Sequence, residues 1–453
     1  MKRGRRFAVG LLLSTAVLVQ PTVAGRGSEP RPPSVVLIVA DDLGWGDVSF
    51  NGRKEWSTPN LDRTAREGLL LRRCYAAATV CAPSRAALLT GKYPIHNGVR
   101  TNRQDLPAGE VTIAEALRDR GYVSGLVGKW HQGARGADGG EPLHPMDQGF
   151  DEFFGYLDAV RAWEKFPSQL WNGRELVPVM GYADDLITDG ALEFIHRHRN
   201  RPFFLYIAYV ATHFHVAAPE DEVALHRGRF AEEDQAVPRN ATYAAMVTRM
   251  DRNIGRLLAG LEHDGLSRET LLIFTSDQGA TFEKGNQGTS AALDSNHPFR
   301  GQKRTLWEGG IRVPGIVWWP GRIAGGTVCD QPVHLTDLLP TIVAAAGGSV
   351  DARWKLDGMN LLPNWTAGTP IPPRTLFWEW RSEGFDQLAA LDHDHKLIIT
   401  RGGKPELYNV VIDPAERRDL SETLATTTET LATRLKSWLS TEISPPLTPP
   451  QQR

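Results

Sequence analysis

The chain has only three cysteines, Cys74, Cys81 and Cys329, among its 453 residues. An odd number leaves at least one of them unpaired. An excess of charge of one sign is also missing, because the formal net charge is −2. We therefore expect neither a nucleic-acid partner nor a strongly basic membrane-binding patch. No internal repeat is apparent along the chain.

Long hydrophobic runs are scarce, and the clearest one lies within the N-terminal residues 1–24. A basic start precedes an apolar run over residues 7–19, and small residues suited to cleavage follow at 22–24. This pattern predicts a secretory signal peptide, since the run is short for a spanning helix. A retained membrane anchor is the alternative. We expect a mature chain that starts near Gly25, is periplasmic or secreted, and has no membrane attachment.

The composition, with 41% hydrophobic and 23% charged residues, is ordinary for a soluble globular protein. Apolar strand candidates alternate with amphipathic helical segments over much of the chain. This alternation predicts an α/β fold with a large, mostly parallel sheet sandwiched by helices, assigned to a catalytic domain of residues 25–365.

The last part of the sequence has a different character. Short strand candidates separated by turn residues predict a small antiparallel sheet, followed by a helix over residues 421–439 and a Pro-rich tail. We assign residues 366–453 to this C-terminal α+β subdomain. The strand candidates lie at residues 375–380, 387–391, 395–400 and 406–410.

The segment around Cys81 carries the first chemical signal. Pro83 suits a first helical position and Gly91 a helix stop, which places Cys81 at or just before a helix N-terminus. The free N–H groups there favour negative charge, and Arg85 returns to the same face one turn later. A nucleophile, a helix end and an arginine together indicate attack on a charged oxyanion ester. A small buried cysteine in an ordinary turn is the alternative.

Ionisable residues follow four strand candidates directly. In an open α/β sheet, ligands bind outside the carboxyl ends of the strands, so we expect these side chains to converge. Taken singly, the aspartate pair could be a capped turn and the lysine–histidine pair an ordinary surface feature. The groups are Asp41 and Asp42, Lys129 and His131, His213, and Asp277 and Gln278.

Two of these strand ends supply a metal-ligand set made only of oxygen. Asp41 and Asp42 come from one strand end, and Asp277 and Gln278 from another. Carboxylate and amide oxygens suit Ca²⁺ or Mg²⁺ better than zinc, which prefers histidine and cysteine. We expect one Ca²⁺ per chain, with Mg²⁺ as the alternative.

The segment Cys81-Ala-Pro-Ser-Arg85, followed by Leu89-Thr-Gly, resembles the signature of the type I sulfatases, the formylglycine-dependent, arylsulfatase-like enzymes of the alkaline-phosphatase-like superfamily. The resemblance implies the fold of that superfamily. It also implies that a formylglycine-generating enzyme converts Cys81 to formylglycine, whose aldehyde hydrate is the nucleophile. Cys74 and Cys329 would then remain, either as a disulfide or as two buried thiols.

Further motifs agree with this family and imply roles for their residues. Gly128-Lys-Trp-His131 is similar to a family motif whose lysine and histidine contact the aldehyde hydrate and the sulfate. His213 matches the residue that protonates the leaving oxygen, and Lys303 matches a sulfate-binding lysine. His215 stands where the family often has proline, and it is either a substrate contact or without a role.

The resemblance also implies that calcium is bound by the two aspartate-containing strand ends and by residue 81. Gln278 replaces the more common asparagine, and its amide oxygen keeps it in the predicted ligand set. The complete set is Asp41, Asp42, Asp277, Gln278 and Cys81 as metal ligands, with Cys81, Arg85, Lys129, His131, His213 and Lys303 as catalytic residues.

The family points to a sulfuric ester hydrolase that cleaves sulfate monoesters, of sulfated carbohydrates and also of aryl sulfates. A phosphonate monoester or phosphodiester hydrolase of the same superfamily is one alternative. A non-catalytic sulfoglycan-binding protein, in which Cys81 stays a thiol, is another. The expected partners are a sulfated small-molecule or glycan substrate and the maturation enzyme, and the sequence carries no signal for an oligomeric state. Trp45 and residues 378–381 and 392–395 could line the cleft or be structural.

Overall fold

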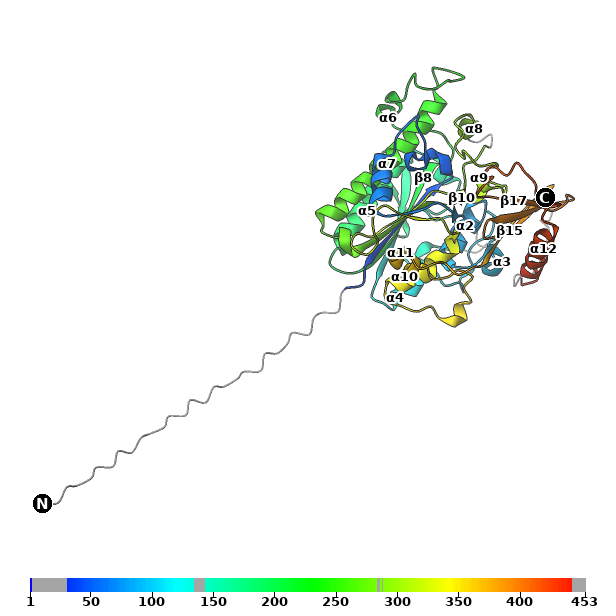
Figure 1. The fold of residues 1–453 in the computed structure, drawn as a ribbon. Helices are drawn as coiled ribbons and strands as arrows, with labels where there is room; N and C mark the ends of the chain where they lie inside the picture. The colour runs from blue at the N-terminus through cyan, green and yellow to red at the C-terminus, as the bar shows by residue number, and fades with distance from the viewer. Residues whose placement is uncertain (2–30, 134–142, 283–285, 287, 442–453) are drawn as a thin grey trace. The chain divides into compact units, whose positions relative to one another are not determined.

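The computed structural model describes residues 1, 31–133, 143–282, 286 and 288–441 (Figure 1). The expected signal peptide and the Pro-rich tail lie outside the described residues. The fold below belongs to the compact unit that begins at Pro32. Within the described part of the chain, no helix is both long enough and apolar enough to cross a membrane.

A ten-stranded sheet forms the centre of this unit, in the order β12-β2-β11-β9-β1-β8-β4-β5-β6-β7. The five strands from β9 to β5 run parallel, whereas β11 is antiparallel to both of its neighbours and β6 and β7 form an antiparallel pair at one edge. The predicted mostly parallel sheet is confirmed. The strands are β1 (Ser34–Asp41), β2 (Leu69–Leu71), β4 (Val123–Lys129), β5 (Glu152–Tyr156), β6 (Gln169–Asn172), β7 (Glu175–Pro178), β8 (Phe203–Thr212), β9 (Thr270–Ser276), β11 (Gly315–Trp318) and β12 (Thr327–Cys329).

The central strand β1 explains why a continuous apolar run is needed here. It pairs with β8 on one side and with β9 on the other, and all of its residues are buried. Its side chains alternate between two separate hydrophobic clusters, with Leu37 in one and Ile38 in the other. A strand covered on both faces cannot use the polar–apolar alternation of a solvent-facing strand.

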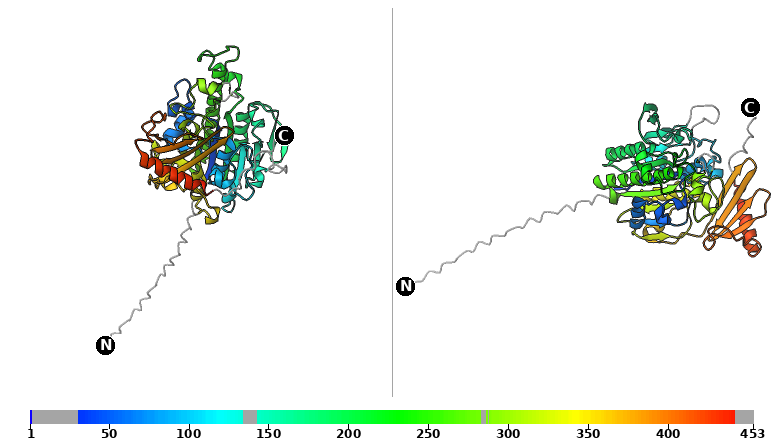
Figure 2. Two further views of the ribbon diagram at one scale, coloured as in Figure 1. Left: turned by 90° about the vertical axis from the view of Figure 1, so that its right-hand side faces the viewer. Right: turned by 90° about the horizontal axis from the view of Figure 1, so that it is seen from above.

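Helices cover both faces of the sheet (Figures 1 and 2). Residues of α1 (Pro59–Glu67), α5 (Ala183–His198) and α7 (Arg239–His263) belong to one cluster with the sheet. On the other face lie α2 (Cys81–Thr90), α4 (Ile113–Arg118) and α10 (Leu338–Ala345). The remaining named helices are α3 (Pro94–Asn97), α6 (Glu220–Ala224), α8 (Thr289–Ala292), α9 (Glu308–Ile311) and α11 (Leu362–Ala367).

The predicted small antiparallel sheet is present as β14 (Thr375–Ser382), β15 (Phe385–Asp392), β16 (His395–Thr400) and β17 (Glu406–Asn409). Helix α12 (Ala425–Leu439) packs against this sheet. The helix begins four residues later than the sequence pattern predicts. The Asp419 side chain accepts a hydrogen bond from the Ser421 N–H and holds a turn at the predicted start.

The packing of Trp378 connects the antiparallel sheet with the preceding chain. Trp378 of β14 is 1% exposed and packs in one cluster with Tyr75 and Ile311, so it is a core residue and does not line a cleft. A second, three-stranded sheet joins β10 (Arg312–Val313), β3 (Cys74–Tyr75) and β13 (Val333–His334). The three cysteines are all buried free thiols.

Candidate active site

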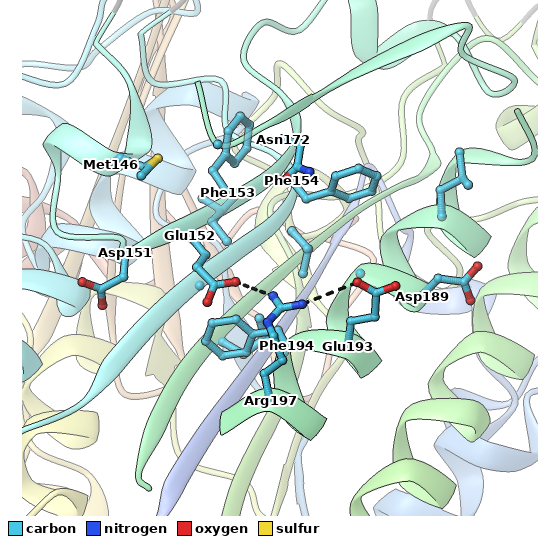
Figure 3. A pocket seen from close by; sticks show the side chains of 17 residues that line it. Met146, Asp151, Glu152, Phe153, Phe154, Asn172, Asp189, Glu193, Phe194 and Arg197 are labelled. Atoms are coloured by element: carbon cyan, nitrogen blue, oxygen red, sulfur yellow. Dashed lines mark hydrogen bonds and ion pairs between the residues drawn. The ribbon is translucent and has the colours of Figure 1, made fainter. Parts of the chain in front are cut away.

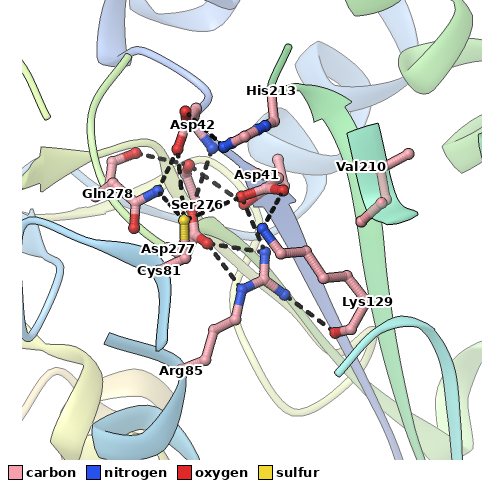
Figure 4. A network of polar contacts seen from close by, with 12 residues as sticks. Asp41, Asp42, Cys81, Arg85, Lys129, Val210, His213, Ser276, Asp277 and Gln278 are labelled. Atoms are coloured by element: carbon pink, nitrogen blue, oxygen red, sulfur yellow. Dashed lines mark hydrogen bonds and ion pairs between the residues drawn. The ribbon is translucent and has the colours of Figure 1, made fainter. Parts of the chain in front are cut away.

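The carboxyl ends of β1, β4, β8 and β9 meet at one edge of the central sheet, as the strand order requires. The side chains that follow these strands surround the first residue of α2, Cys81 (Figure 4). Figure 4 labels every predicted site residue except Lys303 and His131, and Lys303 contacts both Asp42 and Cys81 of this group. The predicted convergence of strand ends therefore exists in the structure.

Cys81 starts α2 because Val80 is extended and the helix then runs to Thr90, with Gly91 in the left-handed conformation that ends it. The Cys81 Sγ lies 3.6 Å from Asp41 Oδ1, 3.4 Å from Lys303 Nζ and 3.3 Å from Gln278 Nε2. Burial raises the pKa of this thiol to about 12, against the opposing effect of nearby lysines. Because the thiolate is the nucleophilic form of cysteine, the unmodified side chain is a poor nucleophile here.

Asp41 is held by cations from two elements. Its Oδ2 accepts a 2.7 Å hydrogen bond from Lys129 Nζ, and Arg85 lies 3.4 Å from its Oδ1. Burial opposes ionisation of this carboxyl, but the positive charge around it, with Lys129 contributing most, holds its pKa well below the usual range. Asp41 is therefore a carboxylate at neutral pH.

Asp42 faces the other lysine of the site. Lys303 Nζ lies 3.0 and 2.9 Å from the two carboxylate oxygens, and Gln278 Nε2 donates to Oδ1. Burial and the neighbouring Asp41 raise the pKa of Asp42, although Lys303 opposes this. The Asp42 carboxylate and, to a smaller extent, the Cys81 side chain raise the pKa of Lys303 above its usual value, against the effect of burial.

Arg85 and Asp277 form a fully buried ion pair behind the cysteine. Arg85 donates from Nε to Asp277 Oδ2 at 2.8 Å, and the other oxygen, Oδ1, accepts from the Asp42 backbone N–H at 3.1 Å. Burial raises the pKa of Asp277 to about 7 in spite of the arginine. Arg85 also contacts the Tyr206 hydroxyl at 3.3 Å. The arginine thus fixes both aspartate-bearing strand ends to α2.

The two site histidines are almost completely buried. Burial, together with Lys129 and Arg85, lowers the pKa of His131 well below its usual value, and burial together with Lys303 does the same for His213. His213 Nδ1 lies 3.0 Å from the Phe214 carbonyl oxygen, which can only accept, so this nitrogen carries a proton. His213 Nε2 then points toward Asp42 Oδ2 at 3.6 Å.

The sequence treats Lys129 and His131 as neighbours on one extended segment. The structure corrects this detail, because His131 has a φ of 55° and therefore leaves the strand direction after β4 ends at Lys129. Lys129 contacts Asp41, and burial together with the charge of Lys129 lowers the pKa of His131, two residues further along the chain.

The donor set fits a hard cation. Ligand atoms of Asp41, Asp42, Cys81 and His213 all lie within 4.8 Å of one another and are buried. The Oε1 atom of Gln278 is buried without a hydrogen-bond partner, although its amide nitrogen contacts Asp42 and Cys81. An orphaned amide oxygen beside two carboxylates is a favourable ligand for Ca²⁺. The geometry adds His213 to the candidate ligands, and Asp277 Oδ1, which accepts one hydrogen bond from the Asp42 N–H, keeps a second lone pair for a cation.

Sequence reasoning misses a buried support behind His213. The Asp184 carboxylate accepts from the Val210 and Ala211 N–H groups at 3.0 and 3.3 Å, while Lys165 Nζ donates to the Val210 carbonyl oxygen at 2.8 Å. The Trp163 ring is stacked near that of His213, with centroids 6.4 Å apart and planes 18° apart. No sequence motif marks these residues; Asp184 lies at the N-terminus of α5, Trp163 and Lys165 precede that helix, and only their contacts at the end of β8 and with His213 reveal the role.

Two cavities differ in their relation to this site. A cavity of 460 Å³ lies between β4, β5 and α5, with Arg197 extending between Glu152 and Glu193, and contains none of the predicted site residues (Figure 3). A smaller hollow of 280 Å³ opens directly beside His131 and is lined by residues 102–105 and 158–160. Among its described lining residues, the smaller hollow includes one predicted site residue, His131.

Comparison with known proteins agrees with this site. The sulfatase family model matches residues 33–349. The N-acetylgalactosamine-6-sulfatase of Canis lupus familiaris is 36% identical over 407 residues, covering 81% of this chain and 71% of that protein. Human arylsulfatase A (Homo sapiens) is 34% identical over 385 residues, covering 77% of this chain and 70% of that protein.

A solved structure extends the similarity to the whole fold. The crystal structure of Ps i-CgsB in complex with k-i-k-neocarrahexaose superimposes with a TM-score of 0.82 at 29% identity, covering 92% of this chain and 94% of that chain. The fold is accordingly the one predicted from the sequence. With a family match over more than half its length and relatives above 30% identity, the chain belongs to the sulfatase family and is a sulfatase.

Proposed function

We propose that this sulfatase hydrolyses sulfate monoesters of carbohydrates, and aryl sulfates as well, with formylglycine formed from Cys81 as its nucleophile. The observation that carries the proposal is the burial of Cys81 against Asp41, Lys303 and Gln278. Burial raises the pKa of this thiol to about 12, which makes the unmodified side chain a poor nucleophile and is consistent with its conversion. A hydrated aldehyde supplies a hydroxyl for attack on sulfur.

The charges around residue 81 match a sulfate ester. Lys129, Lys303 and Arg85 counter the negative charge that builds up on the sulfate oxygens and on the leaving oxygen. Their present carboxylate partners keep them ordered before substrate arrives, so little reorganisation is needed during the reaction.

The two histidines are suited to move protons. His213 presents Nε2 to the site, because Nδ1 is engaged by the Phe214 carbonyl oxygen. We assign to His213 Nε2 the proton that the departing alcohol oxygen takes up; this step requires the imidazolium form of His213, because the one proton of the neutral ring is directed at the Phe214 carbonyl oxygen. We assign to His131, whose Nδ1 is buried without a hydrogen-bond partner, the removal of a proton from the aldehyde hydrate when sulfate leaves.

Asp41, Asp42, Asp277, Gln278 and residue 81 would hold a calcium ion, with His213 beside them. When bound, a divalent cation polarises a sulfate oxygen and lowers the charge repulsion between the ester and the aspartates. The hard oxygen donors favour calcium over zinc.

Further proposals concern processing and architecture. We propose that residues 1–24 are removed on export to the periplasm or the cell exterior, and that a formylglycine-generating enzyme acts on Cys81. We propose residues 25–365 as the catalytic domain and residues 366–453 as a C-terminal subdomain. A carbohydrate substrate is supported by the names of relatives, an N-acetylgalactosamine-6-sulfatase and a protein crystallised with a neocarrahexaose.

The test uses protein co-expressed with a formylglycine-generating enzyme and supplied with calcium. Release of inorganic sulfate is measured from 4-nitrophenyl sulfate and from a sulfated hexosamine, with a phenylphosphonate ester as the comparison and Cys81→Ala as the matched inactive control. We expect sulfate release that depends on Cys81 and exceeds phosphonate cleavage. Faster cleavage of the phosphonate would assign the chain to the alternative hydrolase, and sulfate-ester binding without turnover would support the binding-protein alternative.

A further inference from the structure

Asp42 has an unusual backbone conformation at the metal end of the site. Its φ is 62°, in the left-handed region that residues other than glycine rarely adopt. A residue keeps such a conformation where the surrounding contacts determine it. The Asp42 N–H donates to Asp277 Oδ1 at 3.1 Å, and the Asp42 carbonyl oxygen accepts from the Thr212 hydroxyl at 3.1 Å. The direction of the Asp42 carboxylate therefore depends on Thr212 of β8 as well as on Asp277.

The Thr212 hydroxyl is positioned in turn by Tyr243 of α7. The Tyr243 hydroxyl oxygen lies 3.1 Å from Thr212 Oγ1 and 2.7 Å from Asp47 Oδ2, and all three side chains are buried. Ser295 Oγ lies 3.3 Å from the same phenol oxygen. Burial, with the Asp47 charge adding to it, raises the pKa of Tyr243 well above its usual value. The side chain is therefore a neutral phenol that bridges α7 to the end of β8.

Asp47 holds the other end of this bridge. Besides contacting Tyr243, its Oδ2 accepts from the Gly44 N–H at 3.0 Å, and Arg53 lies 3.6 Å from its Oδ1. Burial raises the pKa of Asp47 to about 6, although Arg53 opposes this, so the group is mainly a carboxylate at neutral pH. Because Gly44 comes two residues after Asp42, Asp47 fixes the chain beyond Asp42, and Tyr243 and Thr212 fix Asp42 itself. We call these three side chains the Asp47–Tyr243–Thr212 network.

The network acts on the site only through Asp42. The candidate ligand cluster in the described part of the chain consists of Asp41, Asp42, Cys81 and His213, so Asp47 lies outside it. The last contact of the network is on the peptide group of a proposed ligand.

A second buried tyrosine–threonine pair has no such connection. The Tyr209 and Thr188 hydroxyl oxygens lie 2.9 Å apart, but Thr188 donates to the carbonyl oxygen of Asp184 in α5. This pair resembles Tyr243 and Thr212 in chemistry and burial and differs in what it holds. It therefore supplies a matched control.

We propose that Tyr243, with Asp47 and Thr212, is a positioning residue for Asp42 and sets how tightly the site binds calcium. This inference rests on the proposed function, specifically on calcium as its metal, and adds residues that do not touch the ion. Groups that hold a metal ligand in place typically change metal affinity tenfold to hundredfold when they are replaced.

The experiment measures calcium affinity by titration calorimetry on matured protein that has been freed of metal with a chelator. Tyr243→Phe and Thr212→Val each remove one hydroxyl of the network and should weaken calcium binding about tenfold. Thr212→Ser keeps the hydroxyl and should retain most of the affinity. Tyr209→Phe loses a similar buried contact, so its thermal midpoint without metal should fall about as far as that of Tyr243→Phe, but its calcium affinity should equal that of the wild type.

Two further readouts separate positioning from general damage to the fold. The double variant Tyr243→Phe/Thr212→Val should lose about tenfold in calcium affinity, because both hydroxyls act through one carbonyl group, whereas independent effects would multiply to about a hundredfold. At saturating calcium, the kcat of Tyr243→Phe for 4-nitrophenyl sulfate should return close to the wild-type value, since the defect lies in metal binding.

Unchanged calcium affinity in both Tyr243→Phe and Thr212→Val would overturn the proposal, and so would an equal loss in Tyr209→Phe. Either result, with a wild type that binds calcium, leaves the proposed function in place. A wild type that releases sulfate but binds no calcium would instead show that the metal assignment of the proposed function is wrong, and the role given to Tyr243 would fall with it.

Discussion

Lys396 of β16 lies with its Nζ 2.8 Å from the Glu308 Oε1 of α9, and both side chains are fully buried. The same ammonium is 2.9 Å from Glu416, whose carboxylate accepts from the Glu308 N–H at 2.7 Å. This contact joins the C-terminal antiparallel sheet to the segment that follows Lys303. Because Gly310 of α9 accepts a hydrogen bond from the Gly279 N–H, next to Gln278, the sheet supports the proposed metal end of the site.

Replacing this lysine should destabilise the whole fold. Lys396→Met leaves Glu416 buried without its cation and Glu308 with Arg312 alone, and breaking a buried ion pair in this way costs about 3–5 kcal/mol. The free energy of unfolding, measured by urea denaturation, should fall by that amount. The matched control is Lys436→Met on the exposed side of α12, expected to change stability by less than about 1 kcal/mol. A similar small change for both variants would contradict the role given to Lys396.

Glu416 should make stability depend on pH near neutrality. Burial, with Glu308 adding to it and Lys396 opposing, raises the pKa of this carboxyl from 4.5 to about 7. The folded chain therefore binds the proton more strongly than the unfolded chain does. The resulting stabilisation is fully present below pH 4.5 and is lost as the pH rises through 7.

The variant Glu416→Gln isolates this contribution, because it removes the titration and retains an acceptor oxygen. Thermal unfolding midpoints of both proteins are compared from pH 5 to pH 8.5. The difference in the free energy of unfolding between wild type and variant, derived from these transitions, should change by about 1–3 kcal/mol across this range. The wild type should lose more stability as the pH rises. Parallel pH curves for the two proteins would contradict the assignment.

The Lys165–Asp184 support should act through the position of His213. Asp184→Asn weakens the hydrogen bonds that the Val210 and Ala211 N–H groups donate to this side chain shortly before the histidine. Lys165→Met removes the hydrogen bond to the Val210 carbonyl oxygen. If His213 protonates the leaving oxygen, displacement of His213 should slow the hydrolysis of esters of poorly acidic alcohols most. We expect kcat to fall about tenfold to hundredfold for an alkyl sulfate and several times less for 4-nitrophenyl sulfate.

Asp185→Asn is the matched control for these variants, since Asp185 is next in sequence but binds Arg249 and Asn253 of α7. This control should change kcat by the same factor for the alkyl sulfate and for 4-nitrophenyl sulfate. A uniform loss on both esters in Asp184→Asn and Lys165→Met would indicate a purely structural role for the support.

The metal assignment predicts a dependence on calcium. Treatment with a chelator should remove activity and lower the thermal midpoint, and added Ca²⁺ should restore both. Gln278→Ala removes the buried amide oxygen that has no protein partner, and loss of one ligand should weaken calcium binding about tenfold or more. Elemental analysis after dialysis measures this directly. Calcium content that is unchanged in Gln278→Ala would exclude this oxygen as a ligand.

Much of the fold and site could be predicted from the sequence, because parallel strands buried on both faces have continuous apolar runs. The runs of β1 and β9 end in aspartates, and the rule that strand ends converge then brought Asp41 and Asp277 to Cys81. The start of α2 at Cys81 and its end at Gly91 also follow from local residue preferences.

Other features depend on tertiary contacts that carry no local pattern. The left-handed φ of His131, the approach of His213 to Asp42 and the hydrogen bond from Ala82 to Asn102 are set by neighbouring elements. Asp184 and Trp378 have no motif either, and Trp378 is a core residue because β14 packs over Tyr75. Periodicity in a sequence indicates which face of an element is buried, but not which element covers it.

The most direct test of the account is the mass of the peptide that contains residue 81, measured on protein co-expressed with a competent formylglycine-generating enzyme. Conversion of the thiol to an aldehyde makes this peptide about 18 Da lighter. We expect the lighter peptide, in a proportion that follows the sulfate-releasing activity of each preparation. A peptide that keeps its thiol in preparations that release sulfate would contradict the assignment of formylglycine at residue 81 as the nucleophile.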